Sequence, residues 1–162
     1  MSKASDTVTV GRVASLHLHP ATARDPLTAV EVIHVVADKG IEENPRYFNR
    51  GSRRQVTLME REQIAAHAAA LGAAGFAAGE VRSNIETTGI NLVALLGQHV
   101  AVGEAVLDFY EPRTPCQQMD ALCPGLRERM GNRQQGVLAR VVRSGVIRVG
   151  DAIRLAKPET AL

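Results

Sequence analysis

The chain has 162 residues, enough for one domain with a sizeable core, and 45% of the residues are hydrophobic. The formal net charge is only +2, basic and acidic residues are interspersed, and aromatic residues are scarce, with no Trp, two Tyr and three Phe. This composition argues against a nucleic-acid-binding protein, which would be more basic or would carry aromatic side chains for stacking on bases.

The N-terminal part predicts β-strands. Residues 7–19 alternate polar and apolar side chains with a slip in phase near Gly11, which indicates a strand or two with a bulge. His17 and His19 would share one face of that strand. Without a third ligand nearby in the sequence, this pair favours surface or hydrogen-bonded histidines over a metal site. A loop follows at 20–26, and the β-branched residues of 30–36 predict a second strand.

A long loop of mixed charge is predicted at residues 40–54. It contains Arg46, Arg50, Arg53 and Arg54. Long unstructured connections inside compact domains tend to be functional or mobile, and we expect these arginines to close over an anionic ligand. A merely solvated charged loop is the commoner outcome for such a composition.

Residues 55–59 predict a short strand, and residues 60–71 predict a helix. Acidic residues occupy its first turn, Ile64, Ala68 and Leu71 form an apolar stripe, and Gly72 can end it. The glycines of residues 73–79 have neither the phosphate-loop nor the dinucleotide-binding spacing.

Arg82, Ser83 and Asn84 form a polar cluster after that segment. They supply a charged fork, a hydroxyl and an amide, all donors that suit a phosphate or a pterin-like heterocycle. Turns use the same residue types, so the cluster alone is weak support for a site.

A stiff loop follows the strand predicted at residues 105–110. Pro112 and Pro115 restrict its backbone, and Cys116 comes next, three residues after Arg113. Positive charge from Arg113 and from the start of a helix at Gln117 would favour the thiolate, the form that attacks and ligates metals. A buried Cys116 acting as a small hydrophobic side chain is an equally good interpretation of these residues.

The second cysteine, Cys123, stands before Pro124 in a setting that indicates packing under a short helix. Two cysteines are too few for a disulfide framework, and these two lack zinc-finger spacing.

The C-terminal half predicts two hairpins. One joins residues 99–102 to 105–110, and the other joins 136–143 to 146–149 through residues 144–145. Many short strands with a few helices indicate a β-rich barrel or sandwich. We expect one domain over residues 1–162, with an ordered core of about 7–156 and short tails at both ends. No apolar run is long enough to span a bilayer and the N-terminus has no signal-like apolar region, so we expect a cytosolic protein.

Several stretches together resemble the MOSC domain family, named for the C-terminal domain of molybdenum cofactor sulfurases. The resemblance rests on residues 54–58, 82–85 with 88–90, 112–116, and 136–141 through 145–147 to 150–151. It implies a mainly β fold, a closed barrel with a few short helices, in a member of the small stand-alone type.

The resemblance also implies binding of the molybdenum cofactor (Mo-molybdopterin), a pyranopterin dithiolene with a phosphate. In related proteins the cysteine of the stiff loop ligates molybdenum, so Cys116 is the implied metal ligand and catalytic residue. The candidate cofactor-binding residues are Arg46, Arg54, Arg82, Ser83, Asn84, Arg113, Thr114 and Cys116. We expect Arg82, Asn84 and Cys116 to converge on one pocket mouth, because each lies at a strand or loop end, where barrels place their sites.

Two stretches depart from the family pattern. In this region many members have a glycine, two further residues, a Gly-Asp pair and a basic residue. This chain has residues 40–46 there, and Glu43 and Asn44 take the places of the Gly-Asp pair. A basic-Ser pair that larger members carry after the first strand is replaced by residues 21–24.

Three functions follow from these observations. The first is a molybdenum enzyme that reduces small N-hydroxylated or N-oxide substrates; a separate reductase would supply electrons, because the chain has no flavin or iron–sulfur motif. The second is a sulfur or cofactor carrier with a persulfide on Cys116. The third is a non-catalytic barrel that has lost cofactor binding. We expect neither nucleic acid nor membrane as a partner, and homo-oligomerisation stays open.

Overall fold

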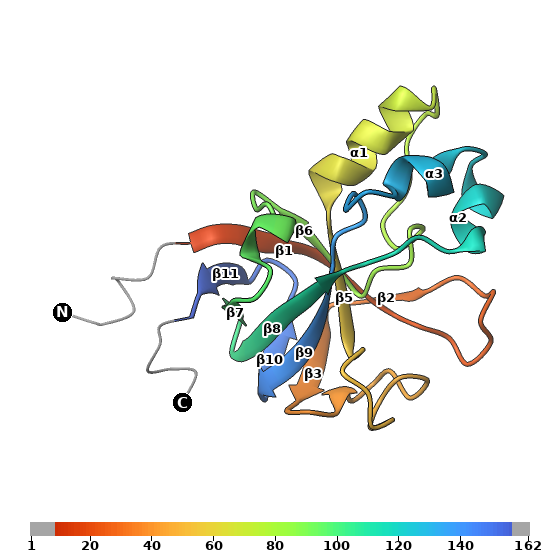
Figure 1. The fold of residues 1–162 in the computed structure, drawn as a ribbon. Coiled ribbons are helices and arrows are strands. Elements are labelled where there is room, and N and C mark those ends of the chain that lie inside the picture. Colours follow the sequence, from red (N-terminus) through yellow and green to blue (C-terminus); the bar gives the residue numbers. More distant parts are fainter. Residues whose placement is uncertain (1–8, 157–162) are drawn as a thin grey trace.

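The computed structural model describes residues 9–156 (Figure 1). The strands are β1 (Thr9–Leu18), β2 (Thr28–Val30), β3 (Val32–Val36), β4 (Gly40–Ile41), β5 (Val56–Glu60), β6 (Ile85–Thr88), β7 (His99–Val102), β8 (Ala105–Pro112), β9 (Val137–Arg143), β10 (Gly145–Arg148) and β11 (Ala152–Leu155). The helices are α1 (Arg61–Ala70), α2 (Gln117–Leu122) and α3 (Leu126–Met130), with a 3₁₀ turn η2 (Val93–Leu95).

Seven strands close into a barrel. Their order is β1-β6-β5-β9-β8-β7-β11, and β11 pairs with β1 to complete the circle. All pairs are antiparallel except β5 with β6. The prediction of a mainly β fold with a closed barrel and a few short helices is confirmed. Strand β2 continues the sheet beyond β1, and β10, β3 and β4 form a separate small sheet.

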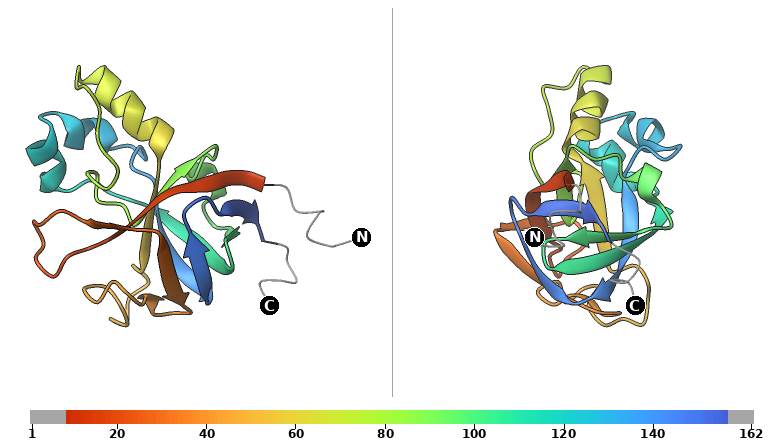
Figure 2. Two further views of the ribbon diagram at one scale, coloured as in Figure 1. Left: turned by 180° about the vertical axis from the view of Figure 1, so that it is seen from behind. Right: turned by 90° about the vertical axis from the view of Figure 1, so that its left-hand side faces the viewer.

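Two apolar clusters stabilise the fold. The barrel interior is filled by strand residues such as Leu16, Leu58 and Phe109, which are fully buried. A second cluster, which includes Ile64 of α1 and Met119 of α2, lies between the helices and the barrel. Figures 1 and 2 show the three helices grouped at one end, with β11 and the start of β1 at the other. None of the helices in residues 9–156 has the length and apolar sequence that a bilayer crossing requires.

Most strands lie close to their predicted positions. β1 is a single strand whose register shifts between Thr9 and Gly11, as the slip in phase predicts. β7 and β8 form the expected hairpin, and β8 continues to Pro112, where it pairs with Val137. The strand predicted at residues 30–36 is divided at Glu31 between β2 and β3.

The predicted hairpin of residues 136–143 and 146–149 is wrong. β9 pairs with β8 and β5, whereas β10 pairs with β3 in the small sheet. Where the chain leaves the barrel, Ser144 Oγ accepts a hydrogen bond from Ala37 N at 2.8 Å, beside the end of β3, and the next four residues pair with β3. At Gly145 the chain passes so close to Glu104 that a Cβ would lie 2.6 Å from that residue's backbone.

Gly136 allows the tight contact between β9 and β5 that fixes one end of the barrel. Its φ is +74°, and an added Cβ would overlap the carbonyl oxygen of Leu58 and lie 2.9 Å from Met59 Cα. Gly72 has a similar φ of +69°, but its Cβ would meet nothing within 4 Å.

We therefore expect Gly136→Ala to lower the free energy of unfolding by about 3 kcal/mol or more, because backbone overlap adds to the cost of positive φ. Gly72→Ala, the matched control, should cost only about 1 kcal/mol from its backbone conformation. Urea titration of both variants measures the difference, and equal losses would show that the close contact with Leu58 is unimportant.

Candidate functional site

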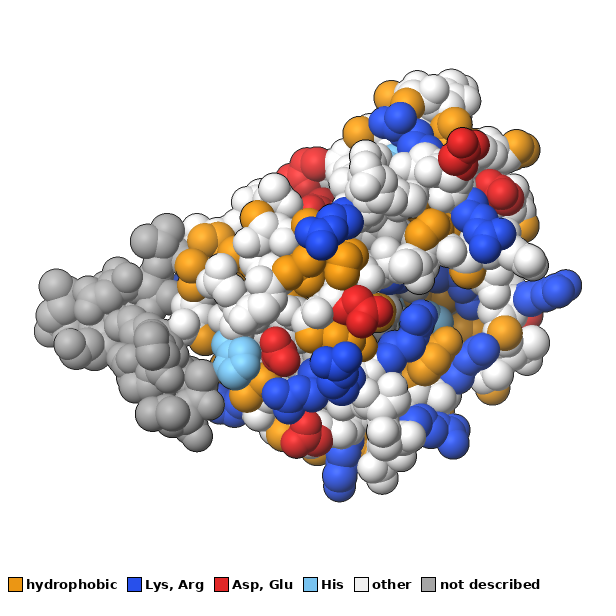
Figure 3. Space-filling model, in the orientation of Figure 1, with side chains coloured by type: hydrophobic (Ala, Val, Ile, Leu, Met, Phe, Trp, Pro, Cys, Tyr) orange, Lys and Arg blue, Asp and Glu red, His pale blue; other side chains and the backbone are white. Residues whose placement is uncertain are grey.

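Loops from four parts of the chain meet at the end of the barrel next to the helices. They are the β1–β2 loop, the β4–β5 loop, the segment before β6 and the β8–α2 loop. A hollow of about 750 Å³ opens there, lined by Arg24, Glu80, Arg82, Cys116, Gln117, Gln118, Ala121 and Leu122. Figure 3 shows Lys and Arg side chains gathered around a hollow on the right-hand part of the face in view. The structure thus brings Arg82 and Cys116 together, as predicted.

Arg113 is a buried cation without an acidic partner. Arg113 is only 7% exposed. Nη1 donates to Ser83 Oγ at 2.7 Å, and Nη2 donates to the carbonyl oxygens of Val81 at 3.1 Å and Arg82 at 3.2 Å. None of the ion pairs formed within residues 9–156 includes Arg113. Burial, followed by the charge of Arg54, lowers the pKa of Arg113 to about 10.

Arg82 holds the β1–β2 loop against the hollow. Its Nη1 donates to Asp25 O at 2.9 Å, and its Nη2 donates to Ala23 O at 2.7 Å. Gln118 of α2 also donates to Ala23 O, at 3.4 Å. The backbone of Arg82 is left-handed, with φ +66°, which is uncommon for a residue with a long side chain and is typical of functional sites.

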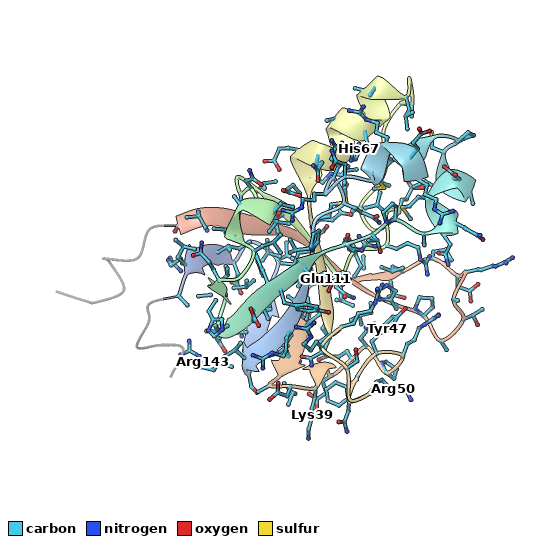
Figure 4. The ribbon with its side chains drawn as sticks, in the orientation of Figure 1. Lys39, Tyr47, Arg50, His67, Glu111 and Arg143 are labelled. Carbon is cyan, nitrogen blue, oxygen red and sulfur yellow. The ribbon has the colours of Figure 1, made fainter. Side chains whose placement is uncertain are left out.

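Arg46 and Arg54 lie beside Tyr47 in the β4–β5 loop. Their guanidinium carbons are 5.4 and 5.9 Å from the Tyr47 ring centroid. The ring of Tyr47 meets the ring of His19 edge to face, with centroids 5.0 Å apart. In Figure 4 Tyr47 lies on the inner side of this loop and Arg50 lies at its outer edge. The loop thus places Arg46 and Arg54 around Tyr47, while Arg53 stacks on Tyr110 of β8 at 4.2 Å from the ring centroid.

The charges of four arginines act on His19. They are the four arginines among the candidate cofactor-binding residues, Arg46, Arg54, Arg82 and Arg113. Burial, followed by the charges of Arg82, Arg113, Arg46 and Arg54 in that order, lowers the pKa of His19 to about 4. Of these four cations, Arg54 lines the same narrow recess as His19. The sequence favours a hydrogen-bonded His19, but its place in the arginine cluster was missed. The only signal is its position at a strand end, directly before Pro20.

Ser83 and Asn84 support the site from behind. Ser83 Oγ accepts from Arg113. Asn84 Oδ1 accepts from Thr57 N and Thr57 Oγ1, both at 3.1 Å, while its Nδ2 donates to His17 O at 3.1 Å and to His19 Nδ1 at 3.2 Å. Asn84 is therefore absent from the hollow beside Cys116, contrary to the expectation that it shares its mouth with Arg82. Its amide instead borders a narrow recess with His19, Tyr47 and Arg54.

The two cysteines differ in exposure. Cys116 is exposed at the start of α2, and its carbonyl accepts from Met119 N at 3.1 Å. It is not a core residue, so the interpretation of a buried hydrophobic thiol is wrong. Cys123 is half-buried against the helical apolar cluster. Thr114, two residues before Cys116, is exposed, and its side chain forms no hydrogen bond within residues 9–156.

Comparison with known proteins now assigns the family. The sequence model of the MOSC domain matches residues 45–154. The chain belongs to the MOSC domain family. This family is associated with binding of the molybdenum cofactor.

Solved structures share the fold of this MOSC domain. The YuaD protein from Bacillus subtilis has a TM-score of 0.73 and 17% identity, over 93% of this chain and 98% of that one. YiiM from Geobacillus stearothermophilus has a TM-score of 0.72 and 19% identity, over 91% and 75%. YiiM from Escherichia coli has a TM-score of 0.67 and 18% identity, over 94% and 75%. No curated protein matches the chain.

A buried, unpaired cation within an arginine cluster predicts that polyvalent anions stabilise this MOSC domain. Inorganic phosphate at about ten times its Kd should raise the free energy of unfolding by about 1.4 kcal/mol and the Tm by a few degrees. Arg113→Met and Arg54→Gln should weaken this response. Arg143→Gln, at an exposed arginine far from the hollow, should keep it. Thermal melts with phosphate and with chloride at equal ionic strength measure the effect, and equal responses in all variants would exclude a specific anion site.

The lowered pKa of His19 predicts a loss of stability in acid. The unfolded chain binds the proton with the ordinary pKa of 6.5 and the folded chain with a pKa of about 4, so protonation favours unfolding. The stability is present above pH 6.5 and is lost as the pH falls toward 4, on the order of 2 kcal/mol between pH 7 and pH 5. Burial also lowers the pKa of His67, with the same sign. Urea titrations should therefore show a shallower pH dependence for His19→Gln than for the parent; identical slopes would contradict the assignment.

Proposed function

We propose that this MOSC domain binds the molybdenum cofactor with Cys116 as the metal ligand and reduces N-hydroxylated or N-oxide compounds. The observation that carries the proposal is the buried Arg113, which forms no ion pair within residues 9–156 and lies close to the exposed thiol of Cys116. A desolvated cation favours an anionic ligand, since its own charge is otherwise uncompensated.

The residues present fit this cofactor. Arg46, Arg54, Arg82 and Arg113 offer planar donors for a phosphate, which guanidinium groups bind in a bidentate manner. A cysteine thiolate is a soft ligand that suits a soft metal site. When bound, the molybdenum would supply two-electron oxygen-atom chemistry at the substrate's N–O bond.

The chain itself would position the substrate. Gln117 and Gln118 offer amide donors and acceptors beside Cys116, and Ala121 and Leu122 form an apolar wall that reduces access of water. Reduction of an N–OH group consumes two electrons and two protons and releases water. The sequence has no flavin or iron–sulfur motif, so we propose a separate reductase as the electron donor.

A carrier function would use the same thiol. Cys116 is exposed, so its thiol could carry a persulfide whose outer sulfur is passed to another protein. The two functions differ in a chemical product: a persulfide releases its sulfur on treatment with cyanide, and a molybdenum-ligating thiolate does not.

The two cysteines provide a matched pair of variants to test the proposal. Protein purified from a host that makes the cofactor should contain molybdenum and a pterin that fluoresces after oxidation. Cys116→Ser should lose at least about tenfold in molybdenum content, because a hydroxyl is a hard ligand of nearly the same volume. Cys123→Ser should keep the metal and lose about 1 kcal/mol of stability, because it puts a hydroxyl against the apolar helical cluster.

Reduction of a benzamidoxime by loaded protein with a chemical electron donor tests the reductase step. Full molybdenum in Cys116→Ser would overturn the ligand assignment. Cyanide-released sulfur from the parent in the absence of molybdenum would favour the carrier.

A further inference from the structure

His19 is held by three separate parts of the barrel end. It follows the last residue of β1, and its backbone N donates to Asn44 Oδ1 at 2.6 Å. Its ring Nδ1 lies 3.2 Å from Asn84 Nδ2, just before β6, and the ring packs edge to face on Tyr47 of the β4–β5 loop. The ring therefore has a fixed position and orientation.

The hydrogen bonds of Asn84 determine which ring nitrogen of His19 carries the proton. Asn84 Oδ1 is the acceptor for Thr57 N, which can only donate, so the amide cannot be turned around. Its Nδ2 must therefore face His19 Nδ1, and an amide nitrogen only donates. Nδ1 is then the acceptor, and the neutral ring carries its proton on Nε2. A second proton, on Nδ1, would point toward the N–H of Asn84 Nδ2, so two donors would face each other.

The Nε2–H group is left without a partner. It forms no hydrogen bond within residues 9–156, and it is not among the buried polar atoms that lack one, so it is accessible. His19 borders the recess that also contacts Tyr47 and Arg54. A fixed donor thus borders the same recess as Arg54, and Arg46 and Arg54 both lie beside the Tyr47 ring that packs on His19.

We propose that the Nε2–H of neutral His19 is a directional hydrogen-bond donor to a phosphate oxygen of the anion that the arginine cluster holds. This inference rests on the proposed function for the identity of that anion, the cofactor's phosphate. Guanidinium groups neutralise charge from several directions, whereas a ring fixed by Asn84, Asn44 and Tyr47 sets the place of one oxygen. The lowered pKa of His19 agrees with a neutral ring at physiological pH.

The first test reads the tautomer directly in cofactor-free, full-length protein. Long-range ¹H–¹⁵N NMR distinguishes the two neutral tautomers and the imidazolium, and the spectrum of His19→Gln identifies the His19 signals among those of the five histidines. We expect the Nε2–H tautomer at pH 7, with the Nε2 and attached proton signals shifting when inorganic phosphate is added. An Nδ1–H tautomer, an imidazolium, or signals that phosphate leaves unchanged would overturn the proposal.

The second test compares two substitutions at the same position. Glutamine can place an N–H near the position of His19 Nε2, whereas phenylalanine keeps the ring shape without a donor. His19→Phe should bind inorganic phosphate about 5- to 10-fold more weakly in calorimetric titration, the size expected for one neutral hydrogen bond. His19→Gln should stay within about 3-fold of the parent. His99→Gln, at a half-buried histidine on β7, is the control and should match the parent.

Cofactor content separates failure of this inference from failure of the proposed function. If the parent retains molybdenum and pterin, and His19→Phe retains as much of both and binds inorganic phosphate as tightly, the donor role is wrong and the function stands. If the parent retains neither, but phosphate shifts the His19 signals and binds as predicted, the function is wrong and the donor role stands.

Discussion

The buried guanidinium of Arg113 is the constraint around which the candidate site is arranged. Its backbone N donates to Gly136 O at 3.1 Å, so the pairing of β8 with β9 fixes where the side chain starts. Its tip is held by the carbonyl oxygens of Val81 and Arg82 and by Ser83 Oγ. These neutral acceptors satisfy donors but leave the charge uncompensated, and Arg82 and Arg54 add repulsion. The cluster of cations is therefore electrostatically unfavourable by itself, and an anion is the ligand that relieves the repulsion most.

The closed barrel holds the arginine cluster in place against this repulsion. Asn84 joins Thr57 at the start of β5 to His17 near the end of β1, and it stands directly before β6. Its hydrogen bonds therefore tie three strands together beneath the arginines. The β1–β2 loop is held less rigidly, by Arg82 and Gln118 through backbone carbonyls. The three strands are fixed, whereas the β1–β2 loop is attached to Arg82, a candidate ligand-binding residue. If Arg82 binds an anion as proposed, anion binding and the position of this loop would influence each other.

Local patterns predicted the strands, the α1 helix and the thiol loop, because alternation, capping and proline act over a few neighbouring residues. They failed where the answer depends on distant pairing. Nothing local shows that the chain switches sheets at Ser144, since its partner Ala37 is far away in the sequence. The arginines were selected by charge, which is visible in the sequence. The place of His19 depends on the pairing of β1 with β6 and on Asn84 and Asn44, which no short window contains.

The altered β4–β5 loop is the feature that most favours a barrel without a cofactor, and its contacts argue otherwise. Asn44 is buried, and its Oδ1 accepts from His19 N, a contact that the aspartate of the family pattern could make equally well. Glu43 points away from this contact, because its carboxylate accepts from His34 N at 2.9 Å in the small sheet. An amide in place of a carboxylate keeps the acceptor but removes a negative charge from beside Arg46 and His19. That exchange makes the cluster more positive, so the departure from the family pattern strengthens the attraction for an anion.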